Sequence, residues 1–116
     1  MFQVGHVIKV KMPFLDGIQS QYPRPYLIIR ADADTVDILN ISSTSGKEHK
    51  LLYPTNIAIL RYNPPLNVPS FVKLDSMQTV KISDLHSWGV KLYGNGQPLN
   101  QEDTERILHR QSTLNT

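Results

Sequence analysis

The chain has 116 residues, a formal net charge of +2 and no cysteine. This length suits one folded domain with a single core, and contents of 40% apolar and 19% charged residues argue against disorder. The lack of cysteine excludes disulfide bonds, thiolate nucleophiles and cysteine-ligated zinc. The mild positive charge permits a nucleic-acid partner without requiring one.

No segment is apolar for long enough to span a membrane, and Met1-Phe2-Gln3-Val4 lacks the charged and apolar regions of a signal peptide. We therefore expect a cytoplasmic protein that does not contact a membrane. The histidines are too scattered for a metal site, so no metal or other cofactor is expected; they are His6, His49, His86 and His109.

Short apolar runs alternate with proline, glycine and asparagine, which is typical of antiparallel strands joined by turns. In the first run, residues 7–12, the side chains of Ile8, Val10 and Met12 share one face of a predicted strand. Lys9 and Lys11 occupy the other face, as expected for a half-buried strand. Further strands are predicted over residues 26–30, 36–41, 56–60, 70–74, 78–82 and 90–93.

The remaining segments predict loops and helices. Residues 63–69 contain three prolines and indicate an irregular loop, and residues 83–86 suggest a helical turn. Asn100 is a candidate N-cap for a C-terminal helix with an acidic first turn. The apolar face of this helix is thin, so the helix needs a surface to pack on. Together these elements predict a mainly β fold, a small bent antiparallel sheet or partly open barrel with a C-terminal helix.

Arg24 is the most informative single residue. It lies between two prolines in Tyr22-Pro23-Arg24-Pro25-Tyr26, directly before an apolar run. Pro25 restricts Arg24 to an extended conformation, and proline is tolerated at the start of a strand. The guanidinium is therefore a permanently charged, forked donor at the mouth of a buried strand, which suits a phosphate group. The alternative is a solvated arginine at a strand start.

Several residues follow an order known from one protein family. The chain contains Gly5-His6-Val7-Ile8, then Gly17, the Arg24-Pro25 pair seven residues later, Asn40-Ile41-Ser42-Ser43, and Phe71-Val72-Lys73-Leu74-Asp75-Ser76-Met77-Gln78-Thr79-Val80. Over residues 5–82, and in the position of its C-terminal helix, the chain resembles the MazF/PemK family, the toxin endoribonucleases of type II toxin–antitoxin systems. The resemblance implies one domain over residues 1–116, with an SH3-like β-barrel and an added helix. It also implies a homodimer that cleaves single-stranded RNA at preferred sequences (an mRNA interferase) and is inhibited by a cognate antitoxin protein.

The chain departs from the family pattern at three positions. Where the family usually ends its third strand with a catalytic threonine, this chain has Ser42, which keeps the hydroxyl group. The family often has a glutamate two residues after the glycine, and here that residue is Gln19. Some members carry an arginine where this chain has Lys73, a point charge in place of a fork. We therefore expect the site to depend more strongly on Arg24.

RNA cleavage without a metal requires activation of a ribose hydroxyl, stabilisation of the phosphate oxygens and protonation of the leaving oxygen. Arg24 suits the second task, with the hydroxyl of Ser42 as an auxiliary donor. Asp75 is the candidate base, and Lys73 can anchor a phosphate or hold Asp75. Because nearby cations weaken a carboxylate as a base, a role for Asp75 in binding substrate or orienting Arg24 stays open, as does a structural role in the turn.

Further candidates surround these residues. His49 lies in the polar segment after Ser42, where it can serve as an acid or base or remain a solvated loop histidine. Lys47 adds positive charge, and Tyr22 can stack on unpaired bases. We predict catalytic roles for Arg24, Ser42 and Asp75, and RNA-binding roles for Gln19, Tyr22, Ser43, Lys47, His49 and Lys73.

Exposed strand edges and a weakly amphipathic C-terminal helix predict a twofold-symmetric homodimer. An acidic antitoxin segment would compete with RNA for a positive groove. That groove is expected to contain Lys9, Lys11, Arg24, Lys47 and Lys73.

Two other function classes stay open. One is a protein-targeting toxin of the same fold, similar to the CcdB gyrase poisons. Those toxins rely on an aromatic-containing C-terminal end, whereas this chain ends in Ser112-Thr113-Leu114-Asn115-Thr116. The other is a non-catalytic barrel that binds RNA or peptide, which a tight aromatic cluster in the sequence would favour.

Overall fold

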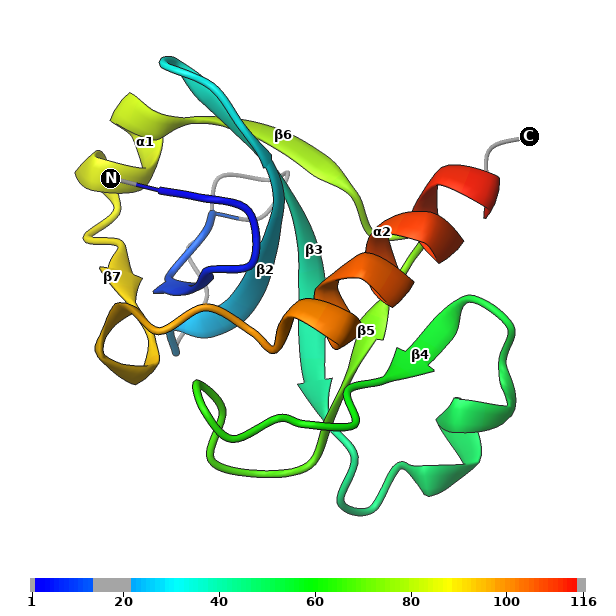
Figure 1. The fold of residues 1–116 in the computed structure, drawn as a ribbon. Coiled ribbons are helices and arrows are strands. Elements are labelled where there is room, and N and C mark those ends of the chain that lie inside the picture. Colours follow the sequence, from blue (N-terminus) through cyan, green and yellow to red (C-terminus); the bar gives the residue numbers. More distant parts are fainter. Residues whose placement is uncertain (1, 14–21, 115–116) are drawn as a thin grey trace.

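The computed structural model describes residues 2–13 and 22–114 and is mainly antiparallel β-structure with a C-terminal helix (Figure 1). Its strands are β1 (Val7–Val10), β2 (Arg24–Ala31), β3 (Thr35–Ser43), β4 (Asn56–Ala58), β5 (Ser70–Lys73), β6 (Gln78–Lys81) and β7 (Lys91–Leu92). Its helices are α1 (Ile82–Ser87) and α2 (Gln101–Leu114), with 3₁₀ turns η1 (Glu48–Leu52) and η2 (Gly94–Gly96). The predicted strands and the C-terminal helix are confirmed, with shifts at their ends. None of the described helices has the length and apolar character needed to cross a membrane.

One seven-stranded sheet contains all these strands, in the order β4-β5-β3-β2-β1-β7, with β6 also paired to β3. Strand β3 is the centre of this arrangement. Its first half pairs with β6, where Val36 faces Val80, and its second half pairs with β5, where Ile41 faces Val72. Strand β2 pairs with β3 along the opposite edge of β3. The described sheet is bent and does not close on itself, so the structure supports a mainly β fold with a C-terminal helix.

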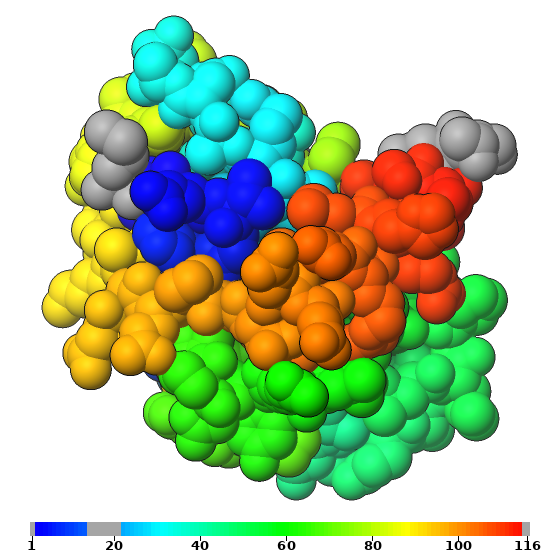
Figure 2. All heavy atoms as spheres, in the orientation of Figure 1, coloured from blue at the N-terminus to red at the C-terminus, as the bar shows by residue number. Residues whose placement is uncertain are grey.

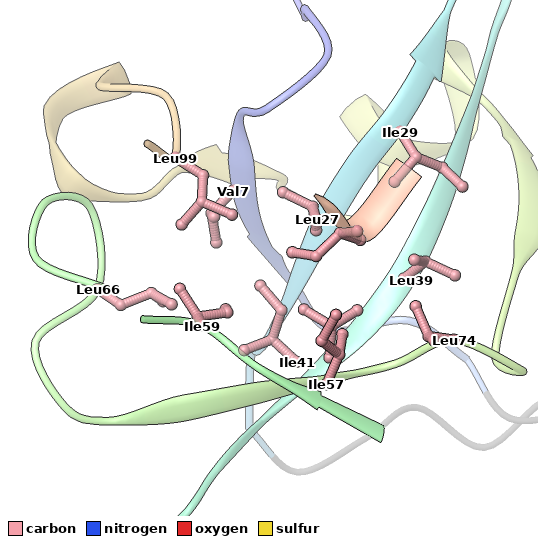
Figure 3. Close-up of a cluster of buried hydrophobic side chains, with 12 residues drawn as sticks. Val7, Leu27, Ile29, Leu39, Ile41, Ile57, Ile59, Leu66, Leu74 and Leu99 are labelled. Atoms are coloured by element: carbon pink, nitrogen blue, oxygen red, sulfur yellow. The ribbon is translucent and has the colours of Figure 1, made fainter. Parts of the chain in front are cut away.

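Buried side chains form a core on each face of the sheet. The core on the α2 side includes Val7, Leu27, Leu39 and Ile57 from the strands and Ile107 from α2 (Figure 3). The core on the α1 side contains Ile8, Val10, Met12, Tyr26, Ile28, Val36, Ile38, Val80 and Leu85. The predicted alternation along β1 is therefore confirmed, because Ile8, Val10 and Met12 share one core while Val7 enters the other.

Helix α2 begins as the sequence predicts, at a capping asparagine. The Oδ1 atom of Asn100 accepts hydrogen bonds from the backbone N–H groups of Glu102 (3.0 Å) and Asp103 (3.2 Å). Figure 2 shows α2, in orange and red, on the surface beside the N-terminal segment in blue. The two segments are joined by the N–H of Leu99, which donates to the carbonyl of Gly5 at 2.7 Å.

Asp103 adds a polar attachment that the sequence did not reveal. Its carboxylate is buried and accepts the backbone N–H groups of Leu60 (3.2 Å) and Arg61 (2.7 Å). Arg106 pairs with it at 2.7 Å and also donates to the carbonyl of Ala58. Because the N–H groups after β4 are taken by Asp103, this strand is shorter than predicted. These bonds supplement the thin apolar face of the helix.

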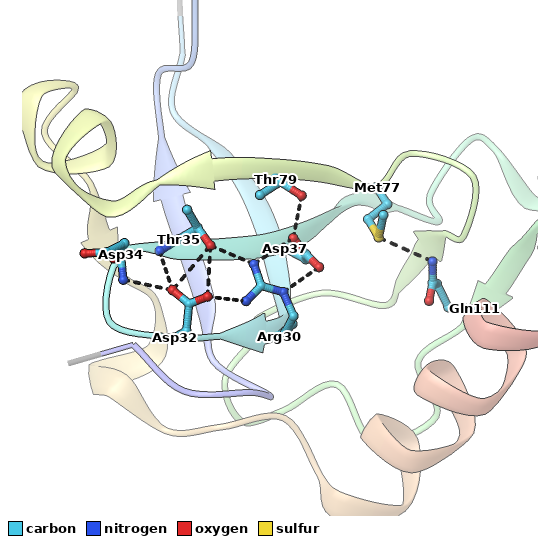
Figure 4. A network of polar contacts seen from close by, with 8 residues as sticks. All are labelled: Arg30, Asp32, Asp34, Thr35, Asp37, Met77, Thr79 and Gln111. Carbon is cyan, nitrogen blue, oxygen red and sulfur yellow. Dashed lines mark hydrogen bonds and ion pairs between the residues drawn. The ribbon is translucent and has the colours of Figure 1, made fainter.

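The hairpin between β2 and β3 has a charged network of its own (Figure 4). Arg30 pairs with Asp37 at 2.8 Å and with Asp32 at 2.7 Å. The hydroxyl of Thr79 on β6 donates to Asp37 at 2.6 Å. The network therefore ties three neighbouring strands together at the end where β6 joins β3.

Candidate functional site

The fold brings the start of β2 beside the end of β3. Tyr26 of β2 faces Asn40 of β3. The pairing of β2 with β3 ends at this pair, and beyond it Arg24 is the register partner of Val10 on β1, while Ser42 is the register partner of Phe71 on β5. Side chains alternate along a strand, so both residues share the face of Tyr26 and Asn40. Arg24 and Ser42 therefore each lie two residues beyond the Tyr26–Asn40 pair, on the same face of the sheet.

The side chain of Arg24 is exposed, whereas Tyr26 is only 6% exposed. Burial raises the pKa of Tyr26, and the positive charge of Arg24 offsets part of that increase. The guanidinium therefore lies within electrostatic reach of the phenol. This arrangement leaves the charged fork at the surface, next to a rigid aromatic side chain.

The segment after β3 turns back so that Lys47 contacts Ser42. The Nζ atom of Lys47 donates a hydrogen bond to the Oγ atom of Ser42 at 3.1 Å. The turn includes Gly46 at a φ of +75°, a conformation that glycine adopts without steric cost. Because Oγ accepts from Lys47, its own proton remains able to donate to a phosphate oxygen. The sequence analysis predicted Ser42 as an auxiliary donor beside Arg24 and did not foresee this contact with Lys47.

Lys73 is the last residue of β5, and Asp75 lies in the turn that follows it. Val72 shares the α2-side core with Ile41, so the alternating Lys73 side chain is directed to the face of Ser42. In the turn that follows, the hydroxyl of Ser76 donates to the carbonyl of Lys73 at 2.6 Å. Asp75 lies in this turn and is exposed. The turn is held by Ser76, and Asp75 is exposed in it, two residues after Lys73.

Asn40 is a site residue that the sequence analysis missed. Its backbone N–H donates to the hydroxyl of Ser76 at 2.8 Å, which ties the turn to β3. Its side-chain Oδ1 is buried and has no hydrogen-bond partner among the described residues. Buried polar atoms are seldom left unpaired, and this oxygen is an exception that is enclosed by the fold rather than open to a substrate. An asparagine within an apolar strand is unusual, and that was the available signal.

The other predicted residues in the described part of the chain are exposed, but no contact gathers them at Ser42. Ser43 is exposed at the end of β3, His49 is exposed in η1, and Tyr22 is 65% exposed just before β2. Gln19 lies outside the described residues. Lys9 is not with them, because its Nζ sits 4.6 Å from the ring centre of Tyr93 and its side chain alternates away from Val10. The basic face near Ser42 is formed by Arg24, Lys47 and Lys73.

Two other parts of the described structure lack the character of a metal or substrate site. Within residues 2–13 and 22–114, no group of three or more histidine, aspartate or glutamate residues is placed to hold a metal ion. A cavity of about 520 Å³ near α1 is lined mainly by apolar residues, with Asp32 and His86. Asp32 is already bonded to Arg30, and His86 stacks on Phe2 at 5.8 Å. The polar groups of this cavity therefore serve the fold.

No model of a known protein family matches the chain, and a search of curated proteins gives no significant match. The resemblance to the MazF/PemK family consequently rests on the residues quoted above, from Gly5 to Val80.

Proposed function

We propose that the chain is a toxin endoribonuclease similar to the MazF/PemK family, which cuts single-stranded RNA at preferred sequences without a metal ion. The observation that carries this proposal is the hydrogen bond from Lys47 to the hydroxyl of Ser42, on the sheet face that Arg24 also occupies two residues beyond the Tyr26–Asn40 pair. Lys73 adds a third cation to the same face. Convergent cations and a hydroxyl donor are what a phosphodiester requires as negative charge develops on its oxygens.

In the proposed reaction the ribose 2′-oxygen attacks the adjacent phosphorus and the bond from phosphorus to the 5′-oxygen breaks. Arg24 donates to the non-bridging oxygens, and the hydroxyl of Ser42 assists it. Asp75 takes the proton of the 2′-hydroxyl or holds the substrate, while Lys73 anchors a neighbouring phosphate. The 5′-oxygen gains a proton from His49 or water. The products are a 2′,3′-cyclic phosphate and a 5′-hydroxyl.

The direct test is cleavage of a single-stranded RNA in excess EDTA, followed by analysis of the product ends. We expect cleavage to persist and to leave a 2′,3′-cyclic phosphate with a 5′-hydroxyl. Loss of cleavage on chelation, or a 5′-phosphate product, would overturn the mechanism. A double-stranded version of the same RNA serves as the control and should stay intact.

The proposal extends to the architecture and partners of the family. The bent sheet with its C-terminal helix is compatible with the family's SH3-like barrel, and the exposed basic face is suited to an acidic antitoxin segment as well as to RNA. A homodimer, located in the cytoplasm, would carry two such sites.

A further inference from the structure

A second pocket, of about 420 Å³, lies between β1, β7 and the segment after α1. This volume is within the range of small-ligand sites. Lys9, Lys11 and Lys91 line it, together with the aromatic residues Trp88 and Tyr93. None of the described residues that line it is acidic. The described part of the pocket therefore combines positive charge with aromatic surface.

Two of these lysines face each other directly across paired strands. In the antiparallel register of β1 and β7, Lys9 is the partner of Lys91. Like charges directly opposite in a sheet destabilise the pairing. The contact of Lys9 with the ring of Tyr93 offsets part of this cost for one lysine only. Such a local violation of strand-pairing rules is expected at functional sites, where an anionic ligand can balance the charge.

The aromatic residues are held in place by the fold. Trp88 is half-buried against the α1-side core, and the hydroxyl of Tyr93 accepts a hydrogen bond from the side-chain amide of Asn67 at 3.2 Å. Aromatic side chains beside a cationic groove are the usual platform for unpaired bases. Both parts of a nucleotide, base and phosphate, thus have complementary groups in one pocket.

We propose that this pocket binds one unpaired nucleotide, with its phosphate between Lys9 and Lys91 and its base against Trp88. The nucleotide is either free or part of an RNA strand. Pro23 lines the pocket, and the next residue, Arg24, pairs with Val10. The pocket therefore adjoins Arg24 in the sequence, with Lys9 on the opposite face of β1 from it. The inference that the pocket binds a nucleotide is argued from these residues alone. Only the use of the pocket as a subsite for RNA rests on the proposed function.

Trp88 is the only tryptophan of the chain, so its fluorescence reports directly on this pocket. Wild-type protein is titrated separately with adenosine 5′-monophosphate, with inorganic phosphate, and with a short 2′-O-methyl RNA that cannot be cleaved by 2′-hydroxyl attack. We expect saturable quenching by the mononucleotide, by the oligonucleotide or by both, and weaker binding of phosphate. Quenching by the oligonucleotide alone identifies an RNA strand as the source, and quenching by the mononucleotide identifies a free nucleotide as a ligand.

The decisive variant is Lys91→Glu, which is exposed and places opposite charges across the two strands. We expect this variant to unfold at the same or a higher denaturant concentration than wild type, and to bind nucleotide about ten- to a hundredfold more weakly. Lys81→Glu, an exposed lysine of β6 outside the pocket, is the matched control and should bind as wild type does.

Unchanged binding by Lys91→Glu, or phosphate binding as tight as that of the mononucleotide, would overturn the inference. RNA cleavage without any ligand effect on Trp88 would also overturn it, while leaving the proposed function intact. Saturable nucleotide binding by a protein that cuts no RNA would support the pocket and contradict the proposed ribonuclease function.

Discussion

The guanidinium of Arg24 is exposed at the surface, while the prolines on either side restrict its backbone. Replacement by alanine removes a pre-positioned donor to the phosphate. We expect Arg24→Ala to lower the single-turnover rate of RNA cleavage by about two to three powers of ten, the scale for loss of one oxyanion donor. Arg61→Ala, an exposed arginine after β4, is the matched control and should cut normally. Cleavage at the wild-type rate by Arg24→Ala would place the active site elsewhere.

At Ser42 the expected requirement is a hydroxyl group rather than serine itself. Ser42→Thr keeps the donor and should retain most of the cleavage rate. Ser42→Ala removes it and leaves Lys47 without its acceptor, so the rate should fall by about ten- to a hundredfold. Circular dichroism of both variants shows whether they are folded. Equal rates for the two variants would exclude the hydroxyl from the reaction.

Among the elements, α2 depends most on a single polar residue. Asp103 is 2% exposed and its carboxylate accepts the N–H groups of Leu60 and Arg61. We expect Asp103→Ala to lower the free energy of unfolding by about 1–3 kcal/mol, because buried donors lose their acceptor. The neighbouring exposed residue provides the control, since Glu102→Gln should leave the free energy of unfolding nearly unchanged. Urea denaturation measures both.

The same carboxylate predicts how stability depends on pH. Burial raises the pKa of Asp103, but hydrogen bonds from Arg106, Arg61 and Leu60 outweigh burial and lower it below its usual value. The unfolded chain therefore binds this proton at a higher pH than the folded chain does. The stabilisation is present above the unfolded value, about pH 4, and is lost as pH falls through the folded pKa. Asp103→Asn should show a smaller loss of stability as pH falls below about 4; an unchanged pH dependence would contradict the assignment.

At the scale of the whole molecule, the surface carries apolar side chains that a monomer leaves in water. Leu52 is 84% exposed and Leu60 is 70% exposed. The sheet has two edge strands, β4 and β7. At the β4 edge, Arg106 and Arg110 donate hydrogen bonds to the carbonyls of Ala58 and Pro54. We expect a homodimer, which sedimentation at micromolar concentration would detect. A single species at the monomer mass of 13.2 kDa would contradict it.

RNA and an acidic antitoxin segment should compete for the same basic face, formed by Arg24, Lys47 and Lys73. Competition follows from electrostatics, because one set of cations cannot neutralise two polyanions at once. Titration of the antitoxin against bound 2′-O-methyl RNA should displace the RNA. Simultaneous binding of both without mutual weakening would rule out direct occlusion.

The sequence by itself determined the features that depend on a few neighbouring residues. Alternation in residues 7–12 was sufficient for β1 and its buried face, and Asn100 was sufficient for the start of α2, because strand periodicity and helix capping act within one or two turns of chain. The position of Arg24 at a strand start was likewise readable, since Pro25 restricts the residue before it.

Only the tertiary structure decided which of these pieces meet. The division of β3 between two partners brings Asn40 to the turn after Lys73, and the docking of α2 buries Asp103 against the backbone after β4. The pairing of Lys9 with Lys91 joins residues from opposite ends of the chain. The register of each strand pair depends on how side chains fill the cores on both faces of the sheet. The local side-chain pattern alone is compatible with several pairings of the same strands.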